Sequence, residues 1–386
     1  AEGGFIRRIN PWGGELHFSN LGLSAVQMGV LIAIWPLSSL LFEIPTGAIA
    51  DIYGRKTSVL IGYILEGLAM LSFFIFKDYY SMLFSFAFLG FAQTFSSGSK
   101  EAWIVDLIKK KNNELMHSYF SKTFVLGNFG LIVSGLLGAF AVKSFGLSSI
   151  WIAAFFSFII SGLFLLFAGE HFAKRKVNIS NSFKKIRSQI KESLKYSYSH
   201  HVLFYFLIAT FVMVFALNFQ TNLSWIPLLK ELGMQEHQFG YLWTAISASV
   251  MLSQVLPMAI SPKGRERKFI IFGIAISSAI LIFVAFANNI FFAMGVLLLS
   301  NFFFFAVRPA ERVYFHKFIP SKLRATIGSV ESMLISIASI VSLPIAGAFI
   351  DKFGARYAIL ASVALMIPAV ILYLRIREDL LVRGFL

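Results

Sequence analysis

The stretch Gly47-Ala48-Ile49-Ala50-Asp51-Ile52-Tyr53-Gly54-Arg55-Lys56 places one acid and two bases between two segments that are apolar enough to cross a bilayer. A tight turn at a membrane surface favours glycine for its permissive backbone, and Arg or Lys on the cytoplasmic side. Those preferences explain Gly54, Arg55 and Lys56 but not Asp51, because an acid just beyond the hydrocarbon needs a positive partner such as a helix N-terminus. The stretch therefore predicts a specialised turn between two membrane spans.

Each fixed position of this stretch fits the pattern Gly-x-x-x-Asp-x-x-Gly-Arg-Lys/Arg. In this respect the chain resembles the major facilitator superfamily, which carries the pattern, called motif A, in the cytoplasmic turn after its second membrane helix. The resemblance implies an all-α integral membrane fold of two six-helix bundles related by an internal repeat. It also implies a motif A gate made of Gly47, Asp51, Gly54, Arg55 and Lys56, with Asp51 near the N-terminus of the span that starts at about residue 325.

The composition indicates a chain that is solvated by lipid. Of its residues 57% are hydrophobic and 14% are charged, against roughly 25% charged in soluble domains. Runs of about 20 apolar residues predict eleven membrane spans, near 25–50, 57–76, 80–106, 116–143, 148–169, 202–228, 238–261, 269–287, 290–316, 325–350 and 356–375. No cysteine is present, so the sequence offers no disulfide, thiolate nucleophile or Cys-ligated metal.

The net charge of +15 predicts the orientation of the chain, not a nucleic-acid partner, because the bases gather in short loops between apolar spans. If the Gly54 turn is cytoplasmic, the loops on its side hold most of the Lys and Arg residues. The opposite loops hold only Lys77, Lys143, Lys230, Lys352 and Arg356. We therefore expect a multi-pass protein of the inner or plasma membrane, with the lipid bilayer as partner.

A polar segment at 171–200 predicts the domain organisation: an N-terminal bundle over 1–170, an amphipathic cytoplasmic linker, and a C-terminal bundle over 201–386. The two bundles repeat one another, since Gly22, Gln27 and Gly29 recur with the same spacing as Gly233, Gln238 and Gly240. The repeat lacks one member, because residues 1–20 are too polar and too short for a spanning helix. We expect a twelve-helix protein without most of its first helix; a natural eleven-span protein is the alternative.

Ionisable residues at membrane depth predict functional sites. A cytoplasmic charge layer is expected from Glu43, Glu101, Lys122, Arg308, Glu311, Arg312 and Glu331. Lys122 and Glu331 hold equivalent places in the repeat, so they could pair when the cytoplasmic side closes; the competing interpretation pairs Glu331 with Arg312 or Arg308. Glu66 lies deeper, and a structural partner is expected for it.

Three amides on the seventh expected helix are candidates for the substrate cavity: Asn218, Gln220 and Asn222. The resemblance implies that this helix lines the cavity. Hydrogen bonding between helices is the equally weighted alternative.

These features predict a non-enzymatic secondary transporter that moves a small solute by alternating access. We expect it to act as a monomer, without a cofactor or metal, and with a proton gradient as the possible energy source. No phosphate-binding loop or nucleophile with a base is present in the sequence. The stretch 94–106 is similar to drug exporters, which favours proton-coupled export of a lipophilic compound. The family's antiporter signature contains a Gly-Pro pair that the glycines of the fifth expected helix lack. Uptake or facilitated diffusion of a polar solute, and a non-transporting receptor or scaffold, remain alternatives.

Overall fold

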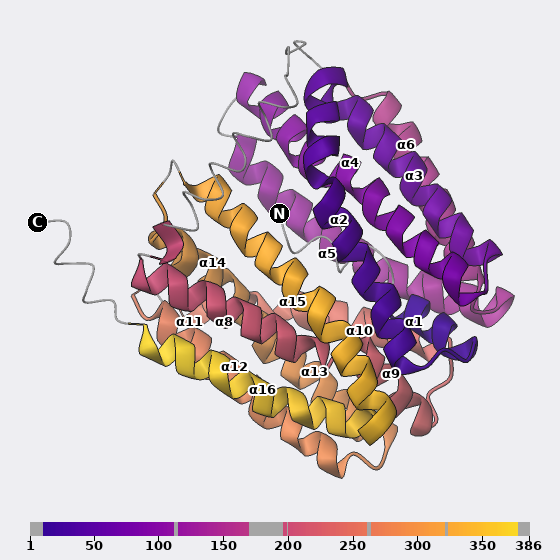
Figure 1. Ribbon diagram of the computed structural model, residues 1–386, viewed down its shortest axis with the longest axis vertical. Helices are drawn as coiled ribbons and strands as arrows, with labels where there is room; N and C mark the ends of the chain where they lie inside the picture. Colours follow the sequence, from indigo (N-terminus) through magenta and orange to yellow (C-terminus); the bar gives the residue numbers. More distant parts are fainter. Residues whose placement is uncertain are drawn as a thin grey trace, which may run out of the picture. The chain divides into compact units, whose positions relative to one another are not determined.

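A computed structural model describes residues 11–111, 115–169, 196–198, 200–260, 264–320 and 323–376. Within these ranges the regular structure is helical, without strands (Figure 1). Ten helical segments are long and apolar enough to cross a membrane, and they coincide with ten of the eleven predicted spans. The remaining span, 80–106, lies in helix α4, whose C-terminal half carries Lys100 and Glu101. The prediction of an all-α integral membrane protein is confirmed.

The helices form two compact units. Unit 1 contains Ala1–Lys185 and Glu236–Thr244, and unit 2 contains Ile186–Gln235 and Ala245–Leu386. Most of the predicted linker at 171–200 lies outside the described residues.

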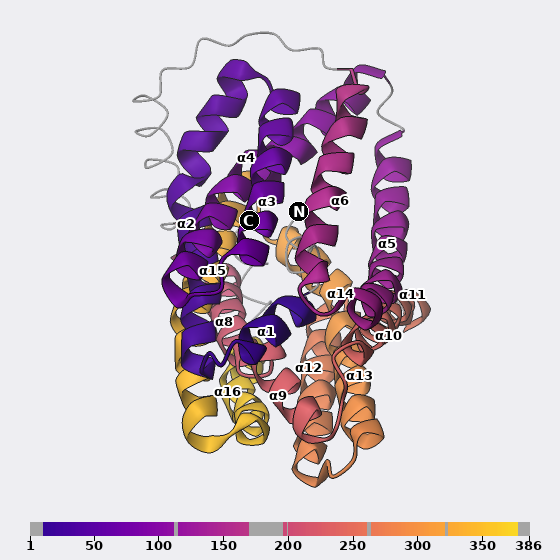
Figure 2. The ribbon, with the colours of Figure 1, turned by 90° about the vertical axis from the view of Figure 1, so that its right-hand side faces the viewer.

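Unit 1 is built on α3, which packs against α4 on one side and α6 on the other (Figure 2). The short helix α1 lies at the end of α2, which packs along α4. The helices of this unit are α1 (Pro11–Asn20), α2 (Ala25–Tyr53), α3 (Arg55–Ile75), α4 (Tyr79–Lys111), α5 (Leu115–Phe145) and α6 (Ser149–Leu166).

Aromatic rings fasten α1 to this unit. Phe73 on α3 stacks on Trp151 of α6 with ring centroids 4.8 Å apart, and Phe18 of α1 lies 5.8 Å from the same indole. All three rings are buried. Because buried aromatic side chains remove large apolar areas from solvent, this cluster holds the ten residues of α1 against the unit although α1 is not a candidate span.

The first turns of α10 (Gln238–Ser253) also belong to unit 1 and cross α5 closely. A methyl group on Gly240 would lie 2.6 Å from the carbonyl oxygen of Gly135 and 2.6 Å from the amide nitrogen of Ala139. The Thr244 hydroxyl donates to the Ile132 carbonyl at 3.1 Å. The two glycines are therefore required for this approach, as small residues are at helix contacts in membranes.

Unit 2 contains the rest of the helices. In it α16 packs against α8 and α12, and α8 also packs against α15 (Figure 1). Its elements are α8 (His201–Asn218), α9 (Asn222–Glu231), most of α10, α11 (Val255–Ile260), α12 (Glu266–Ile282), the 3₁₀ turn η2 (Phe283–Phe286), α13 (Ile290–Ala306), α14 (Arg308–Lys317), α15 (Arg324–Phe353) and α16 (Ala355–Arg375).

The core of unit 2 joins α8, α14 and α16. Phe206 stacks on Phe315 with centroids 4.6 Å apart and meets the Tyr373 ring edge-on at 6.0 Å. These side chains are all buried. The phenol of Tyr373 thus reaches the polar groups of α14 from within an apolar cluster.

Candidate functional site

The turn between α2 and α3 depends on Gly54. Its φ of 106° lies in the region that favours glycine. Its amide donates to Ala50 and its carbonyl accepts from Ser58, so one residue ends α2 and begins α3. The sequence prediction of a tight turn at this point matches the backbone that the structure shows.

Lys56 fastens this turn to α6. Its ammonium donates to the carbonyl oxygens of Leu166 at 3.0 Å and of Ala168 at 2.6 Å, where α6 ends. Terminal helix carbonyls have no partner within their own helix and carry partial negative charge, so a cation is stabilised there. Asp51 lies half-buried in the last turn of α2, Arg55 is half-buried, and Gly47 is exposed. The predicted partner of Asp51, the N-terminus of the span near residue 325, belongs to unit 2, so that contact stays a prediction.

A second turn with the same spacing was missed in the sequence. Gly347, Asp351 and Gly354 repeat the spacing of Gly47, Asp51 and Gly54, and Gly354 has a φ of 92° between α15 and α16. Arg356, two residues later, donates to the carbonyls of Ala285 at 3.1 Å and Ala287 at 2.8 Å. A search for the Gly-x-x-x-Asp-x-x-Gly spacing alone would have found it.

Four charged residues predicted for the charge layer meet in unit 2. The Arg308 guanidinium lies 2.7 Å from the Glu311 carboxylate, and the Arg312 guanidinium lies 2.9 Å from that of Glu331. Both glutamates are buried, at 5% and 4% exposure, while each arginine is partly exposed. A buried carboxylate is stabilised by such a charge-assisted contact. The interpretation that pairs Glu331 with Arg312 matches this geometry.

Tyr373 completes the pair on α14. Its hydroxyl donates to Glu311 at 3.1 Å, so this carboxylate holds α16 to α14. Arg308 also lies over the Phe304 ring, 4.8 Å from its centroid. The Arg312–Glu331 pair joins α14 to α15. The charged residues thus link α14, α15 and α16. The sequence did not identify Tyr373, because tyrosines are common near membrane interfaces.

The other three members of the predicted layer lie in unit 1. Glu43 on α2 and Lys122 on α5 are exposed, and Glu101 on α4 is half-buried. Polar contacts of nearby residues in this unit include a hydrogen bond that Ser96 donates to the buried Glu66 at 2.5 Å and one that Lys100 donates to Tyr63 at 3.0 Å. The Glu66 contact is the structural partner that was expected.

The seventh span is broken in the region of the three candidate amides. Helix α8 ends at Asn218 and α9 begins at Asn222. The Asn218 amide donates to Ser342 of α15 at 2.7 Å and lies 3.4 Å from the Ser339 hydroxyl, so it serves the interhelical role. Gln220 is half-buried in the break; the side chain of Asn222 lies outside the described residues. Broken helices expose backbone dipoles that carriers use to bind solutes.

Another polar contact lies mid-span in unit 1. The indole of Trp35 on α2 donates to the Gln93 side chain of α4 at 3.1 Å, and both residues are half-buried. Gln93 stands alone as a polar amide in the centre of its apolar run, which is the signal that could have identified it.

This arrangement defines a multi-pass helical membrane protein with polar and ionic groups between its spans. The major facilitator superfamily model matches residues 9–340, and the chain belongs to this family. It is a transporter by that membership.

Three curated relatives come from bacteria. The MFS-type transporter YxaM of Bacillus subtilis is 24% identical, over 90% of this chain and 86% of its own. Multidrug resistance protein 2 of Bacillus subtilis is 26% identical, over 75% and 71%. The quinolone resistance protein NorA of Staphylococcus aureus is 23% identical, over 87% and 84%.

Solved structures share the fold. The nucleoside transporter NupG superposes with a TM-score of 0.72 at 13% identity, and an inward-facing bacterial homologue of ferroportin with 0.71 at 12%; each match covers 96% of both chains. The predicted family and fold class are confirmed.

Proposed function

We propose that this transporter exports a lipophilic compound in exchange for protons. Two of the relatives are named for resistance to multiple drugs or to quinolones, and the similarity spans 71% and 84% of their lengths. Resistance to a compound is commonly achieved by removing it from the cell, so these names support export. The direction of transport, the coupling ion and the substrate are proposed here.

The observation that carries proton coupling is the buried pair of glutamates in unit 2. Glu311 accepts from Arg308 and Tyr373, and Glu331 accepts from Arg312. Protonation of either carboxylate replaces a charge-assisted contact with a weaker one, and water screens part of this change because each arginine is partly exposed. Proton uptake would therefore loosen α14 from α15 or α16. A carrier needs this kind of link between titration and helix packing.

The substrate class follows from the mid-span polar contacts. Trp35 and Gln93 of unit 1 place one indole and one amide within an apolar span. Binding sites for drug-sized molecules combine apolar walls with a few polar groups. A lipophilic compound with one or two polar atoms suits such a lining.

Uptake of a small polar solute is the second candidate. The specific observation in its favour is the hydroxyl and amide cluster of Asn218, Ser339 and Ser342 beside the helix break. A non-transporting receptor or scaffold is the third. We also propose an inner or plasma membrane location with the Gly54 turn cytoplasmic, because the basic residues lie on that side, and a monomeric state.

The proposal is tested by flux in proteoliposomes. A fluorescent lipophilic cation and a quinolone serve as substrates, with a proton gradient of either sign or none. Solute flux opposite in direction to the proton flow supports proton exchange, and solute flux in the same direction as the proton flow supports symport. Flux that is indifferent to the gradient supports facilitated diffusion, and no flux of lipophilic or polar solutes supports a receptor.

A pair of variants separates coupling from folding. Glu311→Gln is expected to reduce gradient-driven flux by at least about tenfold, since one lost charge-assisted contact corresponds to roughly 1.5–3 kcal/mol. Glu231→Gln removes an exposed acid of α9 and should change nothing. Full gradient-driven flux in both variants would contradict a coupling role for Glu311.

A further inference from the structure

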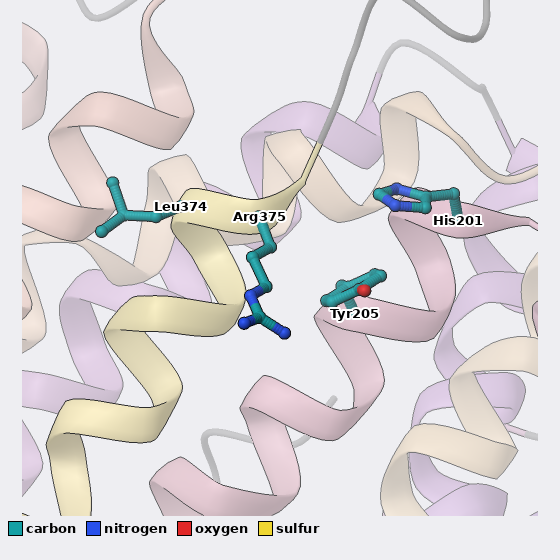
Figure 3. Close-up of a pocket in the computed structure, with 4 residues that line it drawn as sticks. All are labelled: His201, Tyr205, Leu374 and Arg375. Atoms are coloured by element: carbon teal, nitrogen blue, oxygen red, sulfur yellow. The ribbon is translucent and has the colours of Figure 1, made fainter.

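A pocket of about 440 Å³ lies where α8 begins and α16 ends, and the proposed transport pathway does not use it (Figure 3). It is lined by His201, Tyr205, Leu374 and Arg375. Figure 3 shows the guanidinium of Arg375 reaching from α16 toward the Tyr205 ring, with the His201 ring above it on α8. Its volume falls within the roughly 300–1,000 Å³ of small-molecule sites.

The polar groups of this pocket suit an anion. The Arg375 guanidinium offers a planar fork of N–H donors, which matches the oxygens of a phosphate. Tyr205 has a hydroxyl donor and His201 an imidazole N–H. None of the four described residues that line the pocket is acidic. The lining thus combines one cationic side chain with hydrogen-bond donors, and this combination favours a negatively charged ligand.

Two of these groups have no protein partner. Among the residues that the structure describes, no hydrogen bond or ion pair engages the Arg375 guanidinium. The buried Nδ1 of His201 has no hydrogen-bond partner either. The end of α16 does not need Arg375, because Arg267 of α12 donates to the Ile376 carbonyl. The guanidinium of Arg375 is therefore available to a ligand that enters the pocket.

The helix face beside the pocket is exposed and apolar. Leu374 is 60% exposed, and one and two turns earlier on α16 Ile371 is 44% and Ile367 55% exposed. This spacing puts all three on one face of the helix. The apolar stripe therefore runs along α16 and ends at the polar pocket. This order of apolar and polar groups matches that of the acyl chain and headgroup of a lipid.

We propose that this pocket binds the phosphate ester of an anionic phospholipid, with the headgroup on Arg375, Tyr205 and His201 and a chain along the Leu374 stripe. Inorganic phosphate offers the same oxygens without the chain. The stripe favours the lipid as the source, because a free ion gains nothing from exposed leucine and isoleucine.

Native mass spectrometry of the full chain in detergent tests the proposal, with phosphatidylglycerol and phosphatidylcholine as probes. We expect the Kd for phosphatidylglycerol to be at least about tenfold lower than the Kd for phosphatidylcholine. Arg375→Gln should remove this difference, because a charge-assisted hydrogen bond is worth roughly one decade in affinity or more. Tyr205→Phe should weaken binding by a smaller factor. Arg265→Gln is the matched control, since Arg265 is exposed at the start of α12 and does not line the pocket.

Three results would overturn the proposal. In the first, Arg375→Gln binds phosphatidylglycerol as the wild type does. In the second, Arg265→Gln loses as much affinity as Arg375→Gln, which would mean general surface charge. In the third, inorganic phosphate at matched ionic strength binds as tightly as the lipid and depends on Arg375, which would assign the site to the free ion. Circular dichroism and thermal unfolding of each variant confirm that it is folded.

Discussion

Lys56 and Arg356 perform the same task at two different turns. Each follows a glycine of positive φ by two residues, and each donates to two carbonyls at the end of a neighbouring helical segment: Lys56 at the end of α6, and Arg356 at the end of η2, which continues α12. In each case the capped helix packs against the helix that carries the cation, α6 against α3 and α12 against α16. Such recurrence is consistent with the three-helix repeats nested in each half of this family.

These two cations should stabilise their own units. Lys56→Met and Arg356→Met keep most of the apolar part of the side chain but remove the hydrogen bonds to the two carbonyls. Each change is expected to lower the free energy of unfolding by about 1–2 kcal/mol. Thermal unfolding in detergent measures the loss. Lys352→Met is the control, because Lys352 is exposed beside the second turn. Equal midpoints for Arg356→Met and Lys352→Met would show that the carbonyl contacts contribute little.

Asp51 should affect transport more than folding. If it meets a helix N-terminus in one transport state, Asp51→Asn removes up to about 2 kcal/mol from that state, which shifts a two-state equilibrium by up to about 30-fold. We expect normal membrane insertion with flux reduced by about tenfold. No second acid compensates at the equivalent turn of the repeat, where the sequence reads Ile260-Ser261-Pro262-Lys263-Gly264-Arg265. Full activity of Asp51→Asn would contradict a role of Asp51 in the gate.

The contact of α5 with α10 should tolerate no side chain at Gly240. Gly240→Ala forces two backbones apart and is expected to cost about 1–3 kcal/mol and to slow transport. Gly130→Ala is the control, since Gly130 lies on α5, the other helix of this contact, with open space around it. Thermal unfolding and flux are measured for both. A Gly240→Ala variant as stable as Gly130→Ala would mean that the two helices separate at little cost.

Charge exchange separates two roles for Glu331. The ion pair with Arg312 predicts that Arg312→Glu with Glu331→Arg recovers stability that each single change loses. The predicted pairing with Lys122 in another transport state requires that Lys122→Glu with Glu331→Lys also recover flux. Flux at equal expression decides between them. If the second double variant is no better than its worse single, the Lys122 pairing is excluded.

His17 should make stability depend on pH. Burial lowers the pKa of this imidazole, Lys77 lowers it further and Glu236 partly opposes the shift. The folded protein therefore binds fewer protons here than the unfolded chain, so stability falls as the pH drops below the ordinary pKa of about 6.5. His17→Phe keeps a ring between Phe18 and Trp151 and should remove part of this slope. Unfolding midpoints between pH 5 and 8 test it, and identical slopes would contradict it.

Several features could be predicted from the sequence because they depend on neighbouring residues in the chain. Apolar runs of about 20 residues locate membrane spans whatever their packing, and the glycine turn at 54 follows from a backbone that other residues reach only with strain. The family resemblance rests on the same short stretch. The broken seventh span was not predicted, because Asn218 to Asn222 interrupt its apolar run by only a few residues.

What the tertiary structure decided is which distant groups meet. The sequence left Glu331 with several partners, and only the packing of α14 on α15 brought Arg312 to it. In the same way Gly135 and Gly240, Tyr373 and Glu311, and Arg356 and the end of η2 are separated along the chain by other helices. Hydrophobicity is a property of a local segment and can be read from it, whereas a hydrogen bond or ion pair requires two groups within about 3 Å, a distance that the packing of whole helices determines.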